Sequence, residues 1–169
     1  MNHVKGFVPL VETSIIEKTT YSKRTMSEVE LLYSKCGNVS VVRKNGINTV
    51  TVIHNNNQYV IELTQQYPFR VPSRIFVNGI AAKKICYMAG DIFKNYVKRY
   101  YGGFCFCCES LLHGEKWTPI YKLIHIINEI EMILMMKKEI LLRILCNGIR
   151  AKYGCLEEFA PFEDYLLPL

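Results

Sequence analysis

The chain has 169 residues, of which half are apolar and 21% are charged, and its net charge is +6. This length suits one domain with a sizeable core, and the apolar share excludes an extended disordered chain. The modest positive charge permits an acidic partner without demanding one. We therefore expect a single domain over residues 1–169, with a core over about residues 24–153 and a tail over 154–169.

The amino-terminal residues and the cysteines indicate the compartment. The opening stretch MNHVKGFVPLVETSIIEK has charges on both sides of short apolar pieces, so we expect no secretory leader. An odd number of cysteines, seven, indicates reduced thiols, as is typical of the cytoplasm or nucleus. The most apolar region, residues 120–149, is interrupted by charges from Lys122 onward and predicts no membrane-spanning helix.

The first predicted element is a helix over residues 24–35, RTMSEVELLYSK, in which apolar side chains recur at helical spacing. Gly37 follows and can adopt the left-handed conformation that ends a helix. Four β-rich runs come next: VSVVRK, INTVTVIH, QYVIELT and SRIFV. Asn45-Gly46 and residues 55–57 mark tight turns, and Asn78-Gly79 ends the fourth run. This order predicts a four-stranded antiparallel meander.

The segment YPFRVP, residues 67–72, separates the third run from the fourth. Its two prolines forbid regular ladder hydrogen bonds, so Tyr67 and Phe69 should lie on a rigid, extended turn. Such a turn can be a packed corner of the domain. It can also be a docking surface, because a turn that is already rigid loses little conformational entropy when a partner binds.

Three further helices are predicted, over residues 81–101, 119–134 and 137–153. In the first, FKNYVKRYY alternates aromatic and basic residues, a pattern that suits single-stranded nucleic acid. An amphipathic helix explains it more simply, with basic residues in water and an apolar face turned inward. That face would hold Ile85, Met88, Ile92, Tyr96 and Tyr100.

The stretch between these helices holds three cysteines, Cys105, Cys107 and Cys108. Structural zinc sites use paired Cys or His ligands, often with two residues between partners, and this spacing is absent, so we expect no bound metal. Two interpretations stay open. The thiols can be small apolar residues of a short buried strand, or one can be a nucleophile, because a thiolate readily carries an acyl group.

Taken in order, these features resemble a ubiquitin-conjugating enzyme. In that family a Tyr-Pro-Phe-x-x-Pro turn precedes the last meander strand, the active cysteine opens a Cys-Leu-(Ser/Asp)-Ile-Leu stretch, and a Trp-x-Pro follows. The resemblance covers roughly residues 24–153 and implies an α+β fold with an amino-terminal helix, a four-stranded meander, an inserted helix before the active-site loop and two carboxyl-terminal helices. The matching residues are Tyr67, Pro68, Phe69, Pro72, Cys108, Ser110, Leu111, Leu112, Trp117 and Pro119.

The chain departs from the family pattern in two places. The His-Pro-Asn that precedes the family's cysteine, and whose asparagine stabilises the oxyanion, is absent, and the predicted helix over residues 81–101 takes that part of the chain. The Gly-Pro-x-x-Thr-Pro-Tyr hairpin is replaced by HNNNQY. The chain is similar to the compact versions carried by large DNA viruses, which implies the host cell cytoplasm.

The resemblance implies an acyltransferase. An activating enzyme uses ATP to charge ubiquitin and passes it to a cysteine of this chain as a thioester, and a ligase then presents a substrate lysine. Alignment on SLL selects Cys108, and the distance to Trp117 leaves Cys107 open. No bound cofactor is expected. The implied partners are ubiquitin, the activating enzyme, a ligase and protein substrates, without a membrane or nucleic acid.

Other residues receive expected roles from the same resemblance. The ligase surface would comprise Phe69, Thr118, Pro119 and Ile120. Trp117 is expected to be a core anchor that pins the loop, whether or not this surface binds a ligase. Candidates for the missing oxyanion donor, or for orienting the amine, are Tyr100, Tyr101, His113 and Glu109, chosen for their position near the cysteines rather than from the family pattern. The alternative for the tyrosines is packing of the helix onto the domain, and for His113 and Glu109 it is an exposed loop.

Two other functions stay open. One is an inactive variant of this fold that binds ubiquitin or a partner without forming a thioester, as the missing asparagine favours. The other is a viral structural or nucleic-acid-binding module with buried cysteines.

Overall fold

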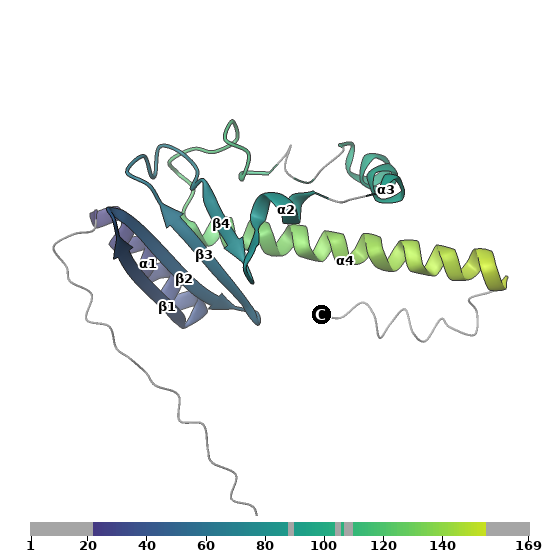
Figure 1. Ribbon diagram of the computed structural model, residues 1–169, viewed down its shortest axis with the longest axis horizontal. Coiled ribbons are helices and arrows are strands. Elements are labelled where there is room, and N and C mark those ends of the chain that lie inside the picture. Colours follow the sequence, from purple (N-terminus) through teal and green to yellow (C-terminus); the bar gives the residue numbers. More distant parts are fainter. Residues whose placement is uncertain (1–21, 88–89, 104–105, 107–109, 155–169) are drawn as a thin grey trace, which may run out of the picture.

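The computed structural model describes residues 22–87, 90–103, 106 and 110–154. These residues form an α+β fold with one antiparallel sheet in the order β1-β2-β3-β4-β5. Helix α1 and the first half of helix α4 lie together against one face of the sheet, and α4 then continues beyond it (Figure 1). The expected combination of an antiparallel meander with flanking helices is confirmed at this level, but the strand count differs from four.

Helix α1 spans Lys23–Cys36 and confirms the helix predicted over residues 24–35. It begins after Ser22, whose Oγ accepts a hydrogen bond from the amide of Thr25 at 3.1 Å. It ends at Gly37, which has a φ of 80°. Val29 and Leu32 are buried, so α1 turns its apolar face onto the sheet.

The strands are β1 (Asn38–Lys44), β2 (Ile47–His54), β3 (Asn57–Leu63), β4 (Arg74–Val77) and β5 (Ile80–Ala81). Each of the three hairpin turns has positive φ at both central residues, the type I′ geometry that matches the twist of paired strands. The prediction of four strands is wrong because Asn78-Gly79 does not end the sheet. It reverses the chain, so that Val77 pairs with Ile80 and a short fifth strand forms.

The core lies between the sheet and the two helices. Alternate residues of β2, β3 and β4 point to it, which is the period-2 burial of a sheet covered on one face. The corresponding face of α4 supplies isoleucines at helical spacing. The most completely buried side chains are Tyr59, Leu32, Ile61, Leu123, Ile126, Ile127, Ile130, Ile133, Ile140, Val50, Val52 and Val97.

The single helix predicted over residues 81–101 is wrong. Two helices occur instead, α2 (Ala82–Cys86) and α3 (Asp91–Tyr101). Tyr87 is extended and Gly90 has a φ of 95°, a conformation that interrupts a helix and that glycine adopts at little cost. Helix α3 ends, as expected, at left-handed Gly102 and packs against α4. Of the predicted inward face, Ile85 is buried and Tyr96 is half-buried, whereas Met88 lies outside the described residues.

The predicted pair of carboxyl-terminal helices is also wrong, because one helix, α4, spans Leu123–Tyr153. Neither glycine nor proline occurs around residues 134–137, and the sequence LMMKK consists of good helix formers. Pro119 lies before the helix, in a turn where the amide of Tyr121 donates to the carbonyl of Thr118. Within the part of the chain that the structure describes, no helix is both long and apolar enough to cross a membrane.

Candidate functional site

The predicted nucleophile falls outside the described residues. Cys108, its alternative Cys107 and the neighbouring Glu109 all lie in the undescribed segment 107–109, so their roles stay predictions. Tyr100 and Tyr101 form the last turn of α3, and only their backbone is described. We call the segment that holds Cys105, Cys107 and Cys108 the predicted reactive loop. It begins directly after α3 and its left-handed Gly102.

Two described residues anchor the ends of this loop. Phe106 is buried, and its amide donates a hydrogen bond of 3.3 Å to the carbonyl of Cys86 at the end of α2. Ser110 is buried as well, and its Oγ accepts a hydrogen bond of 3.1 Å from the amide of Leu112. The bond of Phe106 connects the loop to α2, and the bond of Ser110 is a local turn contact within the loop.

His113 lies on the exposed part of the same loop. Its amide donates to the carbonyl of Ser110 at 3.0 Å, and its Nδ1 lies 3.9 Å from a carboxylate oxygen of Glu115. Both side chains of this pair are largely in water. This geometry is typical of a solvated turn, and the expected oxyanion role of His113 gains no support from its described contacts.

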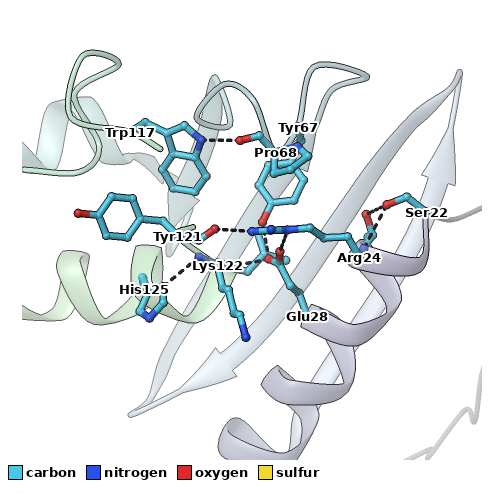
Figure 2. Close-up of polar contacts among 11 residues, drawn as sticks. Ser22, Arg24, Glu28, Tyr67, Pro68, Trp117, Tyr121, Lys122 and His125 are labelled. Atoms are coloured by element: carbon cyan, nitrogen blue, oxygen red, sulfur yellow. Dashed lines mark hydrogen bonds and ion pairs between the residues drawn. The ribbon is translucent and has the colours of Figure 1, made fainter. Parts of the chain in front are cut away.

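Trp117 joins the two loops that the sequence motifs mark. Its side chain is buried, and its Nε1 donates a hydrogen bond of 2.8 Å to the carbonyl of Pro68 (Figure 2). The indole ring also packs between the rings of Tyr67 and Tyr121, with centroid distances of 6.1 and 5.8 Å. The expectation that Trp117 is a core anchor is confirmed.

The four residues predicted to receive a ligase lie on these two loops. Phe69 follows directly after Pro68, whereas Thr118, Pro119 and Ile120 follow directly after Trp117. Phe69 is 78% exposed and Ile120 is 77% exposed, and Thr118 and Pro119 are exposed too. We call this set the two-loop surface. It offers an exposed aromatic and an exposed aliphatic side chain on loops that a buried indole holds together.

A buried carboxylate beneath the two-loop surface was missed by the sequence analysis. Glu28 of α1 is only 3% exposed. Its carboxylate accepts hydrogen bonds from the Oη of Tyr67, from the Nε of Arg24 at 2.5 Å and from the amide of Leu123 at 2.9 Å (Figure 2). Arg24 also donates to the carbonyl of Tyr121 at 2.8 Å. We call these contacts the Glu28 network.

The Glu28 network satisfies a group that would otherwise be costly to bury, and it does so with donors from three separate segments. It therefore links α1, the YPFRVP turn and the start of α4. Burial, followed by the contact with Glu28, raises the pKa of Tyr67 well above its ordinary value. A signal was present in the sequence, because Glu28 shares a helix face with Thr25 and Leu32.

A second carboxylate, Glu131 of α4, attaches the β2–β3 turn. It accepts hydrogen bonds from Tyr59 at 3.2 Å and from Asn55 at 3.0 Å, and His54 lies 3.7 Å away. Burial and Glu131 together raise the pKa of Cys36. A raised pKa leaves less of the Cys36 thiol as the reactive thiolate at neutral pH.

No metal centre emerges from the described residues. Among them, no group of three His, Cys, Asp or Glu side chains is placed to hold a metal ion. The cysteines of the predicted reactive loop lie outside that set.

Comparison of the chain with protein-family models, with curated proteins and with solved structures gives no match.

Proposed function

We propose that the chain is a divergent, compact ubiquitin-conjugating enzyme. The order of its elements supports the proposal: a helix, an antiparallel meander, a Tyr-Pro-Phe turn, a cysteine loop, a Trp-x-Pro and a long helix. The proposed partners are ubiquitin, its activating enzyme, a ligase and protein substrates, in the cytoplasm or nucleus of a cell or in the host cytoplasm if the chain is viral.

The observation that carries the proposal is the two-loop surface. Two motifs separated by about fifty residues meet through the bond between Trp117 and Pro68. That bond leaves Phe69 and Ile120 exposed on adjoining loops, where a ligase domain would bind. Other large apolar side chains are exposed too, such as Ile53 and Ile80, so what distinguishes Phe69 and Ile120 is their place on two motif-bearing loops that Trp117 joins.

The proposed reaction has two acyl transfers. The thiolate of Cys108 attacks the ubiquitin thioester of the activating enzyme, whose thiol leaves, and a new thioester forms on Cys108. A substrate lysine amine then attacks the thioester carbonyl, an isopeptide bond forms, the carbon–sulfur bond breaks, and the amine loses a proton. ATP is consumed only upstream, by the activating enzyme.

The second transfer needs a donor to the developing oxyanion. Removing one such donor typically costs about 10²–10³ in rate. We propose Tyr100 or Tyr101 at the end of α3 as this donor, and Glu109 as the group that orients the amine. Both tyrosines precede the left-handed Gly102, where the chain turns towards the reactive loop.

A charging assay tests the proposal. The protein is mixed with activating enzyme, ATP and ubiquitin, and a band one ubiquitin heavier that reductant removes is expected. Cys108→Ser should give a reductant-resistant oxyester or no band, whereas Cys107→Ser should charge as wild type does. If Cys107→Ser abolishes charging and Cys108→Ser does not, the nucleophile is Cys107.

The missing His-Pro-Asn favours a second candidate, an inactive variant of this fold that binds ubiquitin or a partner. The same assay separates the two functions. Ubiquitin binding without a thioester band would support the inactive variant. If the protein shows neither the thioester band nor ubiquitin binding, the remaining function is a structural or nucleic-acid-binding module.

A further inference from the structure

The second half of α4 carries an apolar stripe that faces away from the core. Met135, Leu145 and Tyr153 are 60%, 57% and 67% exposed. Leu142 and Ile149 are half-buried and complete the stripe at spacings of one helix face. We call these five residues the α4 stripe. A different face of the same helix supplies Ile133 and Ile140 to the core.

A helix that is apolar on two faces is typical of a buried helix. Here α4 extends beyond the sheet, with α2 and α3 to one side of it (Figure 1). Exposed apolar side chains gathered on one face of a helix in this way favour a binding partner for the stripe. The charges beside the stripe restrict the chemistry of that partner.

The end of α4 is basic. Between residues 137 and 152, five Lys or Arg and one Glu occur, which gives 5 − 1 = +4. Of these, Lys137 turns away from the stripe and donates to the carbonyl of Ile85, and Arg143 pairs with Glu139 at 2.5 Å. The residues after the helix, 155–169, have the complementary composition: CLEEFAPFEDYLLPL contains four carboxylates and neither Lys nor Arg, a side-chain charge of −4. This tail also carries large apolar residues, among them Leu156, Phe159, Phe162, Leu166 and Leu167.

The connection between helix and tail allows the chain to change direction. Gly154 ends α4 with a φ of 85°, and its amide donates to the carbonyl of Arg150 at 3.0 Å. The stripe from Met135 to Tyr153 is about 27 Å long at 1.5 Å per residue. Residues 155–169 reach about 50 Å when extended, so the tail is long enough to cover the whole stripe.

We propose that the tail, residues 155–169, folds back along α4 and covers the α4 stripe with its apolar side chains. Its carboxylates then lie beside the exposed basic residues next to the stripe, such as Lys138 and Lys152. A second copy of the chain is a poorer occupant, because two helix ends of charge +4 would repel each other. The proposal concerns a different surface from the predicted reactive loop and holds whether or not the chain transfers ubiquitin.

The tether makes such docking effective. A short connection gives an effective concentration in the millimolar range, so an intrinsic dissociation constant of about 0.1 mM would leave the stripe covered about ten times as often as open. Backbone amides near the stripe would then exchange with solvent about tenfold more slowly.

Hydrogen exchange of the full-length protein, at low micromolar concentration, tests the proposal. Replacing Phe159 and Phe162 with serine should raise the exchange of amides in residues 141–153 about tenfold. Exchange in β2 and β3 should stay unchanged. Ile80→Ser removes another exposed apolar side chain, on the hairpin between β4 and β5, and should leave the exchange of α4 as in wild type.

Charge reversal provides an independent test of tail docking. Glu157→Lys with Glu158→Lys should also accelerate exchange in residues 141–153, and adding Lys152→Glu should restore part of the protection. A photoreactive residue in place of Phe162 should cross-link within one chain to residues 135–153. Equal exchange in wild type and tail variants would overturn the proposal. So would cross-links to another surface, or protection that grows with protein concentration as a dimer forms.

Discussion

Glu28 shows how one side chain can fix several parts of this fold. Three donors from three segments converge on a carboxylate that is almost fully buried. Helical spacing places Glu28 on the same face as Leu32, which indicates burial, but its partners Tyr67 and Leu123 are distant in the chain and are not predicted by that spacing. Long-range pairing of this kind is the part of a site that a single sequence does not reveal.

Glu28→Ala should lower the free energy of unfolding by about 3 kcal/mol. It leaves the Oη of Tyr67 and the amide of Leu123 without their acceptor, and each unsatisfied buried donor costs about 1–3 kcal/mol. Urea unfolding measures the change. Glu30→Ala, in the same helix but exposed, is the matched control and should change stability by less than about 0.5 kcal/mol. Equal losses in both variants would contradict the network.

Phe69→Ala should slow ligase-dependent discharge of the thioester while charging and melting temperature stay as in wild type. An exposed aromatic residue can contribute a large share of a small interface, and at 78% exposure Phe69 contributes little to the core. Ile53→Ala removes a comparable exposed side chain from β2 and should leave discharge unchanged. Loss of charging together with melting temperature would instead make Phe69 a packing residue.

Tyr100→Phe or Tyr101→Phe should reduce single-turnover discharge of the preformed thioester to free lysine by about 10²-fold or more, in whichever position supplies the oxyanion donor. The substitution keeps the ring and removes only the hydroxyl, so packing is preserved. Rates within about twofold of wild type for both variants would sink the oxyanion role and leave the tyrosines as packing residues.

At the scale of elements, the sequence predicted what depends on local chemistry. The Asn-Gly turn at residues 45–46 and the end of α1 at Gly37 follow from residues that tolerate positive φ. The helix boundaries that were predicted wrongly depend on tertiary packing. Gly90 interrupts an otherwise helical pattern, whereas Gly148 lies inside α4 without breaking it. Glycine permits either outcome, so composition alone does not tell them apart.

These two glycines give predictions of opposite sign. Gly90→Ala should destabilise the protein by about 1–2 kcal/mol, because an alanine at a φ of 95° is strained even though its Cβ would have room. Gly148→Ala should stabilise it by about 0.5–1 kcal/mol, since alanine favours a helix interior and its Cβ would meet nothing within 4 Å. Thermal or urea unfolding of both variants checks the signs. The same sign for both would contradict the assigned conformations.

At the scale of the whole molecule, two tyrosines make stability sensitive to alkali. Burial, with a carboxylate beside each phenol, raises the pKa of Tyr59 and Tyr67 above the unfolded value of about 10. The stability that the neutral phenols contribute is therefore complete below about pH 10 and is lost as the pH rises further. By pH 11 the free energy of unfolding should fall by about 1.4 kcal/mol for each tyrosine. Urea unfolding between pH 8 and 11 measures it, and Tyr67→Phe should halve the pH-dependent loss.

The position of α4 also determines when the protein can fold during synthesis. The face of the sheet that α4 covers is apolar, and the meander is complete at Ala81, whereas the last fully buried residue of α4 is Ile140. A ribosome adds about 5–20 residues per second, so the nascent sheet waits several seconds with that face uncovered. We expect the nascent chain to depend on a chaperone that binds extended apolar segments. Slowing translation between residues 81 and 140 should lower the soluble yield more than slowing it within α1.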